Sequence, residues 1–318
     1  MEKTPLRFPG IAALAALFLA AAGTASAEAP KVVASIVPVH GLVAAVMEGM
    51  GEPRLIAAKG SSPHAYALKP SDARALADAD VVFWIAPQFE SFMARAVETL
   101  GGNARVVDLA KAQGITLLPV RAGGLFAGAG AGAGADAATD HAARDFHIFL
   151  DPENGIAMAR EIIAVLSRAD PENAARYQAN GENLIAATRA KETEIRLMLA
   201  GAARSGFIVY HDATQYFENR FGLSAVGSIS GQDEAPPGAA HVAAIRDYLK
   251  ANPGACVLRE PQTANELVEG LVADTGAAIG VVDPDAADFR FKDPEAIRKI
   301  GFEHIPYQQI GPRQKTEK

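Results

Sequence analysis

Residues 31–38 read Lys-Val-Val-Ala-Ser-Ile-Val-Pro, an apolar, β-branched run that ends at a proline. Such a run indicates a strand that is buried on both faces. Residues 42–50 then have the composition of a helix, and residues 81–85 form the next strand-like run. Buried strands that alternate with helices predict a parallel sheet covered by helices on both sides.

The same alternation continues in two blocks, one on each side of a long helical stretch. We expect further strands at 105–109, 207–210, 223–228, 255–259 and 278–283, and further helices from 70 and at 90–100, 153–168, 212–220, 237–251 and 263–274. Helical composition from Asp170 to Leu199 predicts one helix of about 29 residues, about 43 Å long. The predicted fold class is α/β, with two similar lobes, each a parallel sheet flanked by helices, joined by one long rigid connector helix.

The N-terminus has the pattern of a secretory signal peptide. Lys3 and Arg7 supply a basic start, residues 11–23 are apolar, and residues 25–27 read Ala-Ser-Ala, which fits a cleavage site after Ala27. We therefore expect a signal peptide at 1–27 and an exported, periplasmic mature protein.

The remaining segments follow from the pattern of strands and helices. We expect an N-terminal α/β lobe at 28–168, a connector helix at 169–201, a C-terminal α/β lobe at 202–287 and a divergent tail at 288–318. Within the first lobe, residues 123–145 are rich in Gly, Ala and Asp, a composition that cannot bury apolar area and predicts a mobile loop.

Composition narrows the possible functions. The chain has 318 residues and a formal net charge of −7, which argues against a nucleic-acid-binding protein, because such proteins need a basic surface. Its single cysteine, Cys256, excludes an internal disulfide and a cysteine-based zinc finger. We expect Cys256 to be a free thiol in a buried strand.

Three histidines lie beside or within apolar, strand-like runs. His64 occurs in Ser-Ser-Pro-His-Ala-Tyr-Ala-Leu-Lys-Pro-Ser-Asp (61–72), His147 in Asp-Phe-His-Ile-Phe-Leu (145–150), and His211 in Phe-Ile-Val-Tyr-His-Asp (207–212). We expect them to bind one metal ion in a cleft between the lobes, since ligands bind beyond the carboxyl ends of parallel strands. Neutral imidazole suits zinc, copper, nickel and iron, and Asp283 or water would complete four ligands. A single histidine in a strand is more often a core residue than a ligand, so spacing alone leaves both interpretations open.

These motifs resemble those of the periplasmic metal-binding proteins of ABC transporters, especially the zinc-uptake members. The similarity covers about residues 31–285 and includes Arg-Glu-Pro-Gln at 259–262 and Gly-Val-Val-Asp-Pro at 280–284. It implies that His64, His147 and His211 bind Zn²⁺, and that Asp283 occupies the position of a fourth, acidic ligand in manganese-binding relatives. It also implies a monomer that delivers Zn²⁺ to an inner-membrane permease driven by an ATPase.

The chain departs from these relatives in two places. The insert of relatives is rich in histidine, whereas residues 123–145 contain one histidine, His141. Relatives also end with an amphipathic helix and a cysteine that pairs with the equivalent of Cys256, and the tail at 288–318 has neither feature. We expect the loop to be a plain spacer, and His40, His241 and His304 to have no metal-binding role.

Two other functions remain open from the sequence. A manganese- or iron-binding relative would use two histidines and two carboxylates, so three histidines favour zinc. Three histidines with an open position also occur in zinc hydrolases, but no carboxylate is recognisable as a general base, and we expect no enzymatic activity. Because imidazoles must lose any proton to bind zinc, the sequence predicts that zinc affinity falls below about pH 6.5.

Overall fold

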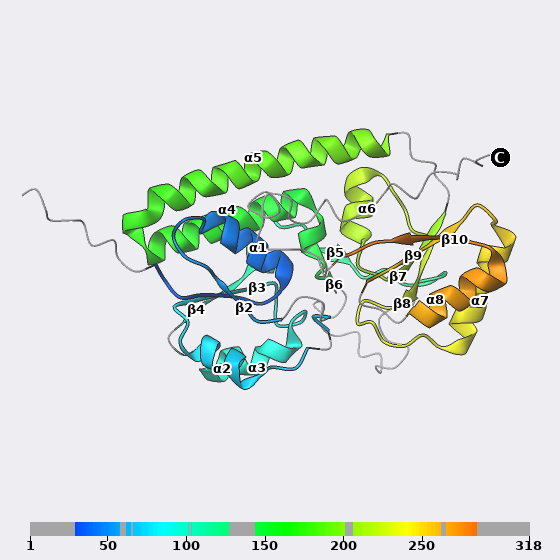
Figure 1. Cartoon of the computed structure of the whole chain (residues 1–318), viewed down its shortest axis with the longest axis horizontal. Coiled ribbons are helices and arrows are strands. Elements are labelled where there is room, and N and C mark those ends of the chain that lie inside the picture. Colours follow the sequence, from blue (N-terminus) through cyan, green and yellow to red (C-terminus); the bar gives the residue numbers. More distant parts are fainter. Residues whose placement is uncertain are drawn as a thin grey trace, which may run out of the picture.

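The computed structural model describes residues 29–57, 62–64, 66–100, 102, 104–126, 144–200, 206–261 and 265–284. These residues form two lobes, each built on a four-stranded parallel sheet (Figure 1). The 26-residue helix α5 (Ala174–Leu199) lies along the N-terminal lobe and extends toward the C-terminal lobe. The predicted α/β fold class is confirmed.

The sheet of the N-terminal lobe has the strand order β2-β1-β3-β4. Its strands are β1 (Val32–Ala34), β2 (Arg54–Leu55), β3 (Val81–Trp84) and β4 (Arg105–Asp108). Because neighbouring side chains of a strand point to opposite faces, Val32 and Ala34 enter one hydrophobic core and Val33 enters another.

Helices cover both faces of this sheet (Figure 1). One face is covered by α1 (Val37–Val46), α4 (Pro152–Ala169) and α5, and the other by α2 (Pro70–Ala77) and α3 (Ser91–Leu100). Burial on both sides explains why the two central strands, β1 and β3, are apolar along their whole length.

The sheet of the C-terminal lobe has the order β10-β9-β7-β8. Its strands are β7 (Phe207–His211), β8 (Gly227–Ser230), β9 (Cys256–Arg259) and β10 (Ala278–Val281). When the strands of each lobe are numbered 1 to 4 along the chain, the strands of both sheets lie in the order 2-1-3-4. Helices α7 (Ala239–Ala251) and α8 (Asn265–Thr275) pack on one face of this sheet. The two lobes are similar in topology, as predicted.

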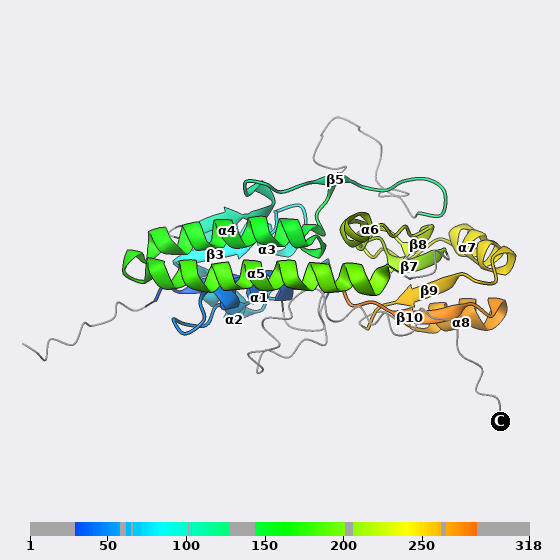
Figure 2. The ribbon, with the colours of Figure 1, turned by 90° about the horizontal axis from the view of Figure 1, so that it is seen from above.

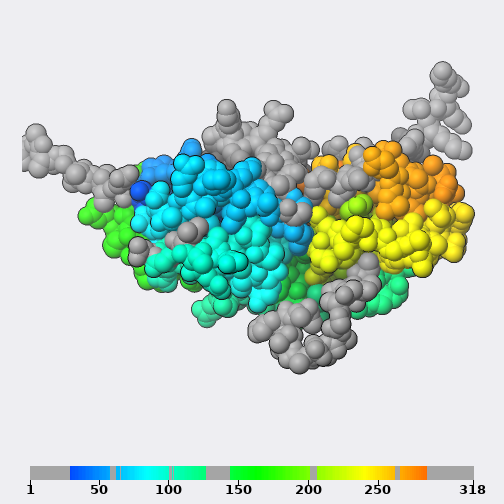
Figure 3. Space-filling model, turned by 90° about the horizontal axis from the view of Figure 1, so that it is seen from below, coloured from blue at the N-terminus to red at the C-terminus, as the bar shows by residue number. Residues whose placement is uncertain are grey.

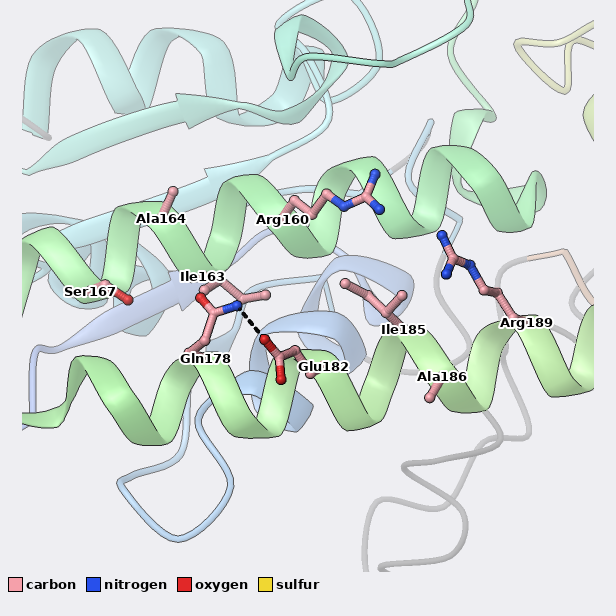
Figure 4. Close-up of a pocket in the computed structure, with 9 residues that line it drawn as sticks. All are labelled: Arg160, Ile163, Ala164, Ser167, Gln178, Glu182, Ile185, Ala186 and Arg189. Atoms are coloured by element: carbon pink, nitrogen blue, oxygen red, sulfur yellow. Dashed lines mark hydrogen bonds between the residues drawn. The ribbon is translucent and has the colours of Figure 1, made fainter.

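Helices α4 and α5 pack closely along one seam. Gly181 of α5 permits the approach, because a Cβ at this position would lie 2.1 Å from Cδ1 of Ile163 on α4. A groove of about 570 Å³ follows the same seam, lined by α4 between Arg160 and Ser167 and by α5 between Gln178 and Arg189 (Figure 4). A single turn, η3 (Pro171–Asn173), joins the two helices, so α5 begins five residues later than the connector predicted at 169–201.

Between β5 (Leu118–Pro119) and β6 (Arg144–Asp145) the chain crosses to the C-terminal lobe and returns. The two short strands pair in antiparallel fashion, and between them Leu125 forms a parallel bridge with Gly227 at the edge of β8. Leu125 therefore pairs with β8, Gly123 bridges Phe126, and residues 144–145 pair with β5, so both ends of the loop predicted at 123–145 are structured. Residues 127–143, including His141, lie outside the described residues.

The lobes meet through α6 (Gln215–Phe221), which follows β7 but packs into the core of the N-terminal lobe through Tyr216 and Phe217. Arg220 of α6 binds Asp151 through two hydrogen bonds of 2.8 Å, and the hydroxyl of Tyr216 donates to the carbonyl of Asp145 at 2.5 Å. Seen from above and from below, the lobes lie side by side (Figures 2 and 3).

The predicted signal peptide, residues 1–27, and the predicted tail, residues 288–318, lie outside the described residues, as does His304. Within the described part of the chain, no helix combines the length and the apolar character needed to cross a membrane. Cys256 is a free thiol, as expected, but it is half-buried at the edge of a hydrophobic core.

Candidate metal centre

His64 lies on the turn between β2 and α2. Its backbone N–H donates to Oγ of Ser62 at 3.1 Å. The carboxylate of Asp72 ties the following residues to the first turn of α2, because it accepts hydrogen bonds from the hydroxyl of Tyr66 and the backbone N–H of Lys69. Pro63 and His64 themselves form a turn.

His147 follows β6 and begins the short 3₁₀ turn Ile148–Leu150, whose three side chains are buried. The apolar run 146–150 is therefore a turn and not part of a strand, which corrects the prediction. Consecutive side chains of this run all face the core, whereas those of a strand would alternate between two faces. Oδ1 of Asp145 accepts hydrogen bonds from both the backbone N–H and Nδ1 of His147, each at 2.9 Å.

His211 is the last residue of β7, and it is fully buried. Its Nδ1 lies 2.6 Å from Oε1 of Glu260, which directly follows the neighbouring strand β9. The strand order of the lobe reverses between β7 and β9, and ligands of α/β proteins commonly bind at such a position.

The three imidazoles converge from the two lobes. Nε2 of His147 lies 3.4 Å from Nε2 of His64 and 3.3 Å from Nε2 of His211. A tetrahedral zinc ion with Zn–N bonds of 2.0–2.1 Å requires nitrogen atoms about 3.3–3.4 Å apart. The spacing of the nitrogens therefore fits a single zinc ion bound by the three rings.

The ring protons of two of these histidines are placed by carboxylates. Because Nδ1 of His147 and of His211 donates to Asp145 and Glu260, the lone pair of each Nε2 points toward the shared centre. The sequence motifs contained both carboxylates, but only the folded structure shows which ring each one contacts.

Burial keeps these imidazoles neutral. Burial, and then the proximity of His147 and His211, lowers the pKa of His64 to about 2, and burial lowers the pKa of His147 well below its ordinary value. A neutral ring is the form that binds a metal ion, so proton competition at these two rings begins at a lower pH than the predicted value of about 6.5.

Further groups surround the centre. The ring of Phe89 meets the rings of His64 and His147 edge-on, with centroids 5.0 Å apart in each case. Oε1 of Glu234 is buried without a hydrogen-bond partner, 4.0 Å from Nδ1 of His211. Sequence reasoning missed Phe89 and Glu234, since neither belongs to a motif that contains a histidine.

The other residues considered from the sequence lie elsewhere. Asp283 follows β10 and is almost fully buried, but it belongs to neither group of candidate ligands within the described residues, which are His64, His147 and His211, and His211, Glu234 and Glu260. Nε2 of His40 lies 2.9 Å from the carbonyl of Pro53, and Nε2 of His241 lies 2.8 Å from the carbonyl of Ser228.

A protein family described as "Zinc-uptake complex component A periplasmic", ZnuA, matches residues 32–289 of the chain. The chain belongs to this family. Two ZnuA relatives, both named "High-affinity zinc uptake system protein ZnuA", match almost the whole chain. The protein of Brucella abortus (strain 2308) is 40% identical over 307 residues, covering 87% of this chain and 91% of the relative. The protein of Paracoccus denitrificans (strain Pd 1222) is 32% identical over 303 residues, covering 87% and 90%.

Solved structures share the ZnuA-type fold. "Crystal structure of ZnuA" is 23% identical, with a TM-score of 0.69, covering 86% of this chain and 97% of that one. The periplasmic zinc-binding protein TroA of Treponema pallidum is 17% identical, with a TM-score of 0.72, covering 86% and 95%. At these identities the likeness shows the fold, and it agrees with the two-lobed architecture.

Proposed function

We propose that this chain is the periplasmic zinc-binding component of an ABC transporter for high-affinity zinc uptake. Membership of the ZnuA family supports this function. The observation that carries it is the convergence of three Nε2 atoms, spaced for tetrahedral zinc, from both lobes. In this function Zn²⁺ is cargo, bound between the lobes and then released to the membrane.

His64, His147 and His211 are the ligands in this proposal, and Asp283 or water completes the coordination. Three nitrogen ligands favour zinc over manganese or iron, which prefer more oxygen ligands. Of the three rings, His147 and His211 are almost completely buried, so the ion would be largely shielded from solvent.

The receiving partner would be an inner-membrane permease with its ATPase, and the chain would act as a monomer. Export through the segment 1–27, cleaved after Ala27, would place the protein in the periplasm.

A hydrolytic function has less support in the structure. Asp145 and Glu260 are engaged with the Nδ1 atoms of ligand histidines, and Asp212, next to His211, is paired with Arg121. A general base must reach a metal-bound water, and these carboxylates are already committed to other partners.

Elemental analysis of the purified mature protein tests the proposal. We expect one zinc per chain in the wild type and a loss of bound zinc in His147→Ala. The matched control is His241→Ala, because the ring of His241 binds the carbonyl of Ser228 and lies outside the cluster. Wild-type protein that held no zinc, or a His147→Ala variant that kept it, would rule the proposal out.

A further inference from the structure

A buried carboxylate lies at the strand ends of the N-terminal lobe. Glu90 is fully buried, and its two oxygens accept hydrogen bonds from three neutral donors. Oγ of Ser35 donates to it at 2.5 Å, the backbone N–H of Ile85 at 3.0 Å, and the backbone N–H of Ala86 at 2.9 Å. These bonds connect the residue after β1 with the residues after β3.

Glu90 has a counterpart in the C-terminal lobe. In each lobe the carboxylate follows the third strand of the 2-1-3-4 arrangement, and its partner lies at the end of the first. In the N-terminal lobe the pair is Glu90 and Ser35, and in the C-terminal lobe it is Glu260 and His211. Glu260 contacts a ligand histidine directly, whereas Glu90 holds a backbone turn.

The turn that Glu90 holds carries the aromatic ring beside the metal centre. The backbone N–H groups of Phe89 and Glu90 both donate to the carbonyl of Ala86 at 3.0 Å, which closes the turn. Phe89 contacts His64 and His147 edge-on, with interplanar angles of 78° and 87°. His64 and His147 are 83 residues apart in the chain, and both rings pack against the ring of Phe89.

We propose that Glu90 is a positioning residue for the metal centre, acting through Phe89, whose ring fixes the relative orientation of His64 and His147. The inference rests on the proposed zinc-binding function. Ligands that are held in their binding geometry before the metal arrives lose less conformational freedom on binding, which raises affinity.

Zinc affinity and the cobalt spectrum test this role in the full mature chain. Glu90→Gln keeps the volume of the side chain but replaces one acceptor oxygen by a donor that faces backbone N–H groups. We expect zinc to bind about tenfold more weakly, near the lower end of the effect of removing a group that supports a ligand. We also expect the visible absorption of the Co²⁺-loaded protein to change in position or intensity, because the angles between the ligands change.

Phe89→Leu is the second variant, and it keeps the test decisive if Glu90→Gln does not fold. It should weaken zinc binding and alter the cobalt spectrum in the same direction. Matched controls are Asp170→Asn, which removes a buried carboxylate at the junction of α4 and α5, and Phe83→Leu, which shortens a fully buried ring on β3. Both controls should lower the melting temperature while leaving zinc affinity and the cobalt spectrum unchanged.

The outcomes separate the two proposals. Wild-type zinc affinity and cobalt spectra in both Glu90→Gln and Phe89→Leu would overturn the positioning role and leave the zinc-binding function intact. Equal losses of affinity in the controls would also overturn it, because the effect would then reflect general loosening of the core. A wild-type protein without zinc affinity would instead overturn the proposed function.

Discussion

Two buried carboxylates decide which nitrogen of their partner imidazoles carries the proton. Asp145 and Glu260 each accept from an Nδ1–H, which directs the lone pair of Nε2 of His147 and His211 toward the shared centre. Glu260 is itself fully buried, so its negative charge acts on His211 with little screening by solvent.

We expect Glu260→Gln to weaken zinc binding by about 10–100-fold, because a neutral amide holds the Nδ1 proton less firmly and lowers the basicity of Nε2. Isothermal titration with a competing chelator measures the change. The control is Glu266→Gln, the same substitution at an exposed position on α8. Equal affinities of wild type and Glu260→Gln would contradict this account of the ring proton.

Glu90 gives the fold a dependence on pH. Burial raises the pKa of its carboxyl to about 7, whereas a glutamic acid in an unfolded chain titrates near about 4.3. The folded state therefore binds this proton more tightly, and the associated stability is complete below about pH 4 and is lost as the pH rises through about 7.

We expect the metal-free wild type to lose stability relative to Glu90→Gln between pH 5 and pH 8. Urea unfolding of both proteins at each pH measures the difference, and the raised pKa of Asp145 cancels because both proteins contain it. Glu98→Gln, at an exposed position of α3, is the control and should follow the wild type. A constant difference between Glu90→Gln and the wild type across this range would be incompatible with the raised pKa.

At the scale of elements, the seam between α4 and α5 depends on the absence of a side chain. Gly181→Ala would place a Cβ against Ile163, and we expect it to destabilise the protein by about 1–3 kcal/mol through overpacking. Gly155→Ala, in α4, is the matched control, since a Cβ there meets nothing within 4 Å. We expect the control to stabilise the protein by about 0.5–1 kcal/mol, because alanine is the better helix former. Thermal unfolding of both variants measures the two changes in stability. Similar effects of the two substitutions would disprove close packing at the seam.

The elements differ in how well the sequence predicts them. Long periodic segments such as α4 and buried strands such as β3 were predicted near their observed positions, because their apolar pattern is set by burial on known faces. Residues 146–150 were predicted as strand-like and form a 3₁₀ turn, since a short apolar run does not distinguish the two. Leu125 joins the edge of β8 through a pairing between distant segments, which local composition does not encode.

The sequence likewise predicts only part of the candidate site. The three histidines stand in motifs that can be recognised along the chain, whereas the contacts of Phe89 and Glu90 depend on which strand ends meet. Asp283 as fourth ligand stays a prediction. A motif therefore identifies the atoms that bind, and the tertiary structure identifies the atoms that hold them in place.

At the scale of the whole molecule, the lobes are joined by packing as well as by the chain. Besides the ion pair of Arg220 with Asp151, the guanidinium of Arg121 donates to Glu218 at 2.6 Å and pairs with Asp212. Burial alone would lower the pKa of Arg121, but these two carboxylates raise it overall, so the guanidinium stays charged. Such contacts oppose a wide opening of the lobes.

We therefore expect crystals with and without zinc to show little lobe rotation, and a rotation of tens of degrees would contradict this expectation. Arg220→Met should loosen the interface, because Asp151 then loses its cation at a nearly buried position. We expect a larger radius of gyration by X-ray scattering in the metal-free variant. Arg168→Met, which removes a long and exposed ion pair with Glu161, should leave the radius unchanged.

The location of the three imidazoles has a consequence for how the molecule melts. Two rings belong to one half of the polypeptide and the third to the other half, so neither half offers a complete coordination set. A captured ion would act as a removable cross-link that unites both halves into one cooperative unit. Chelation would withdraw that link and weaken the coupling between the halves, which the packing of α6 would still maintain.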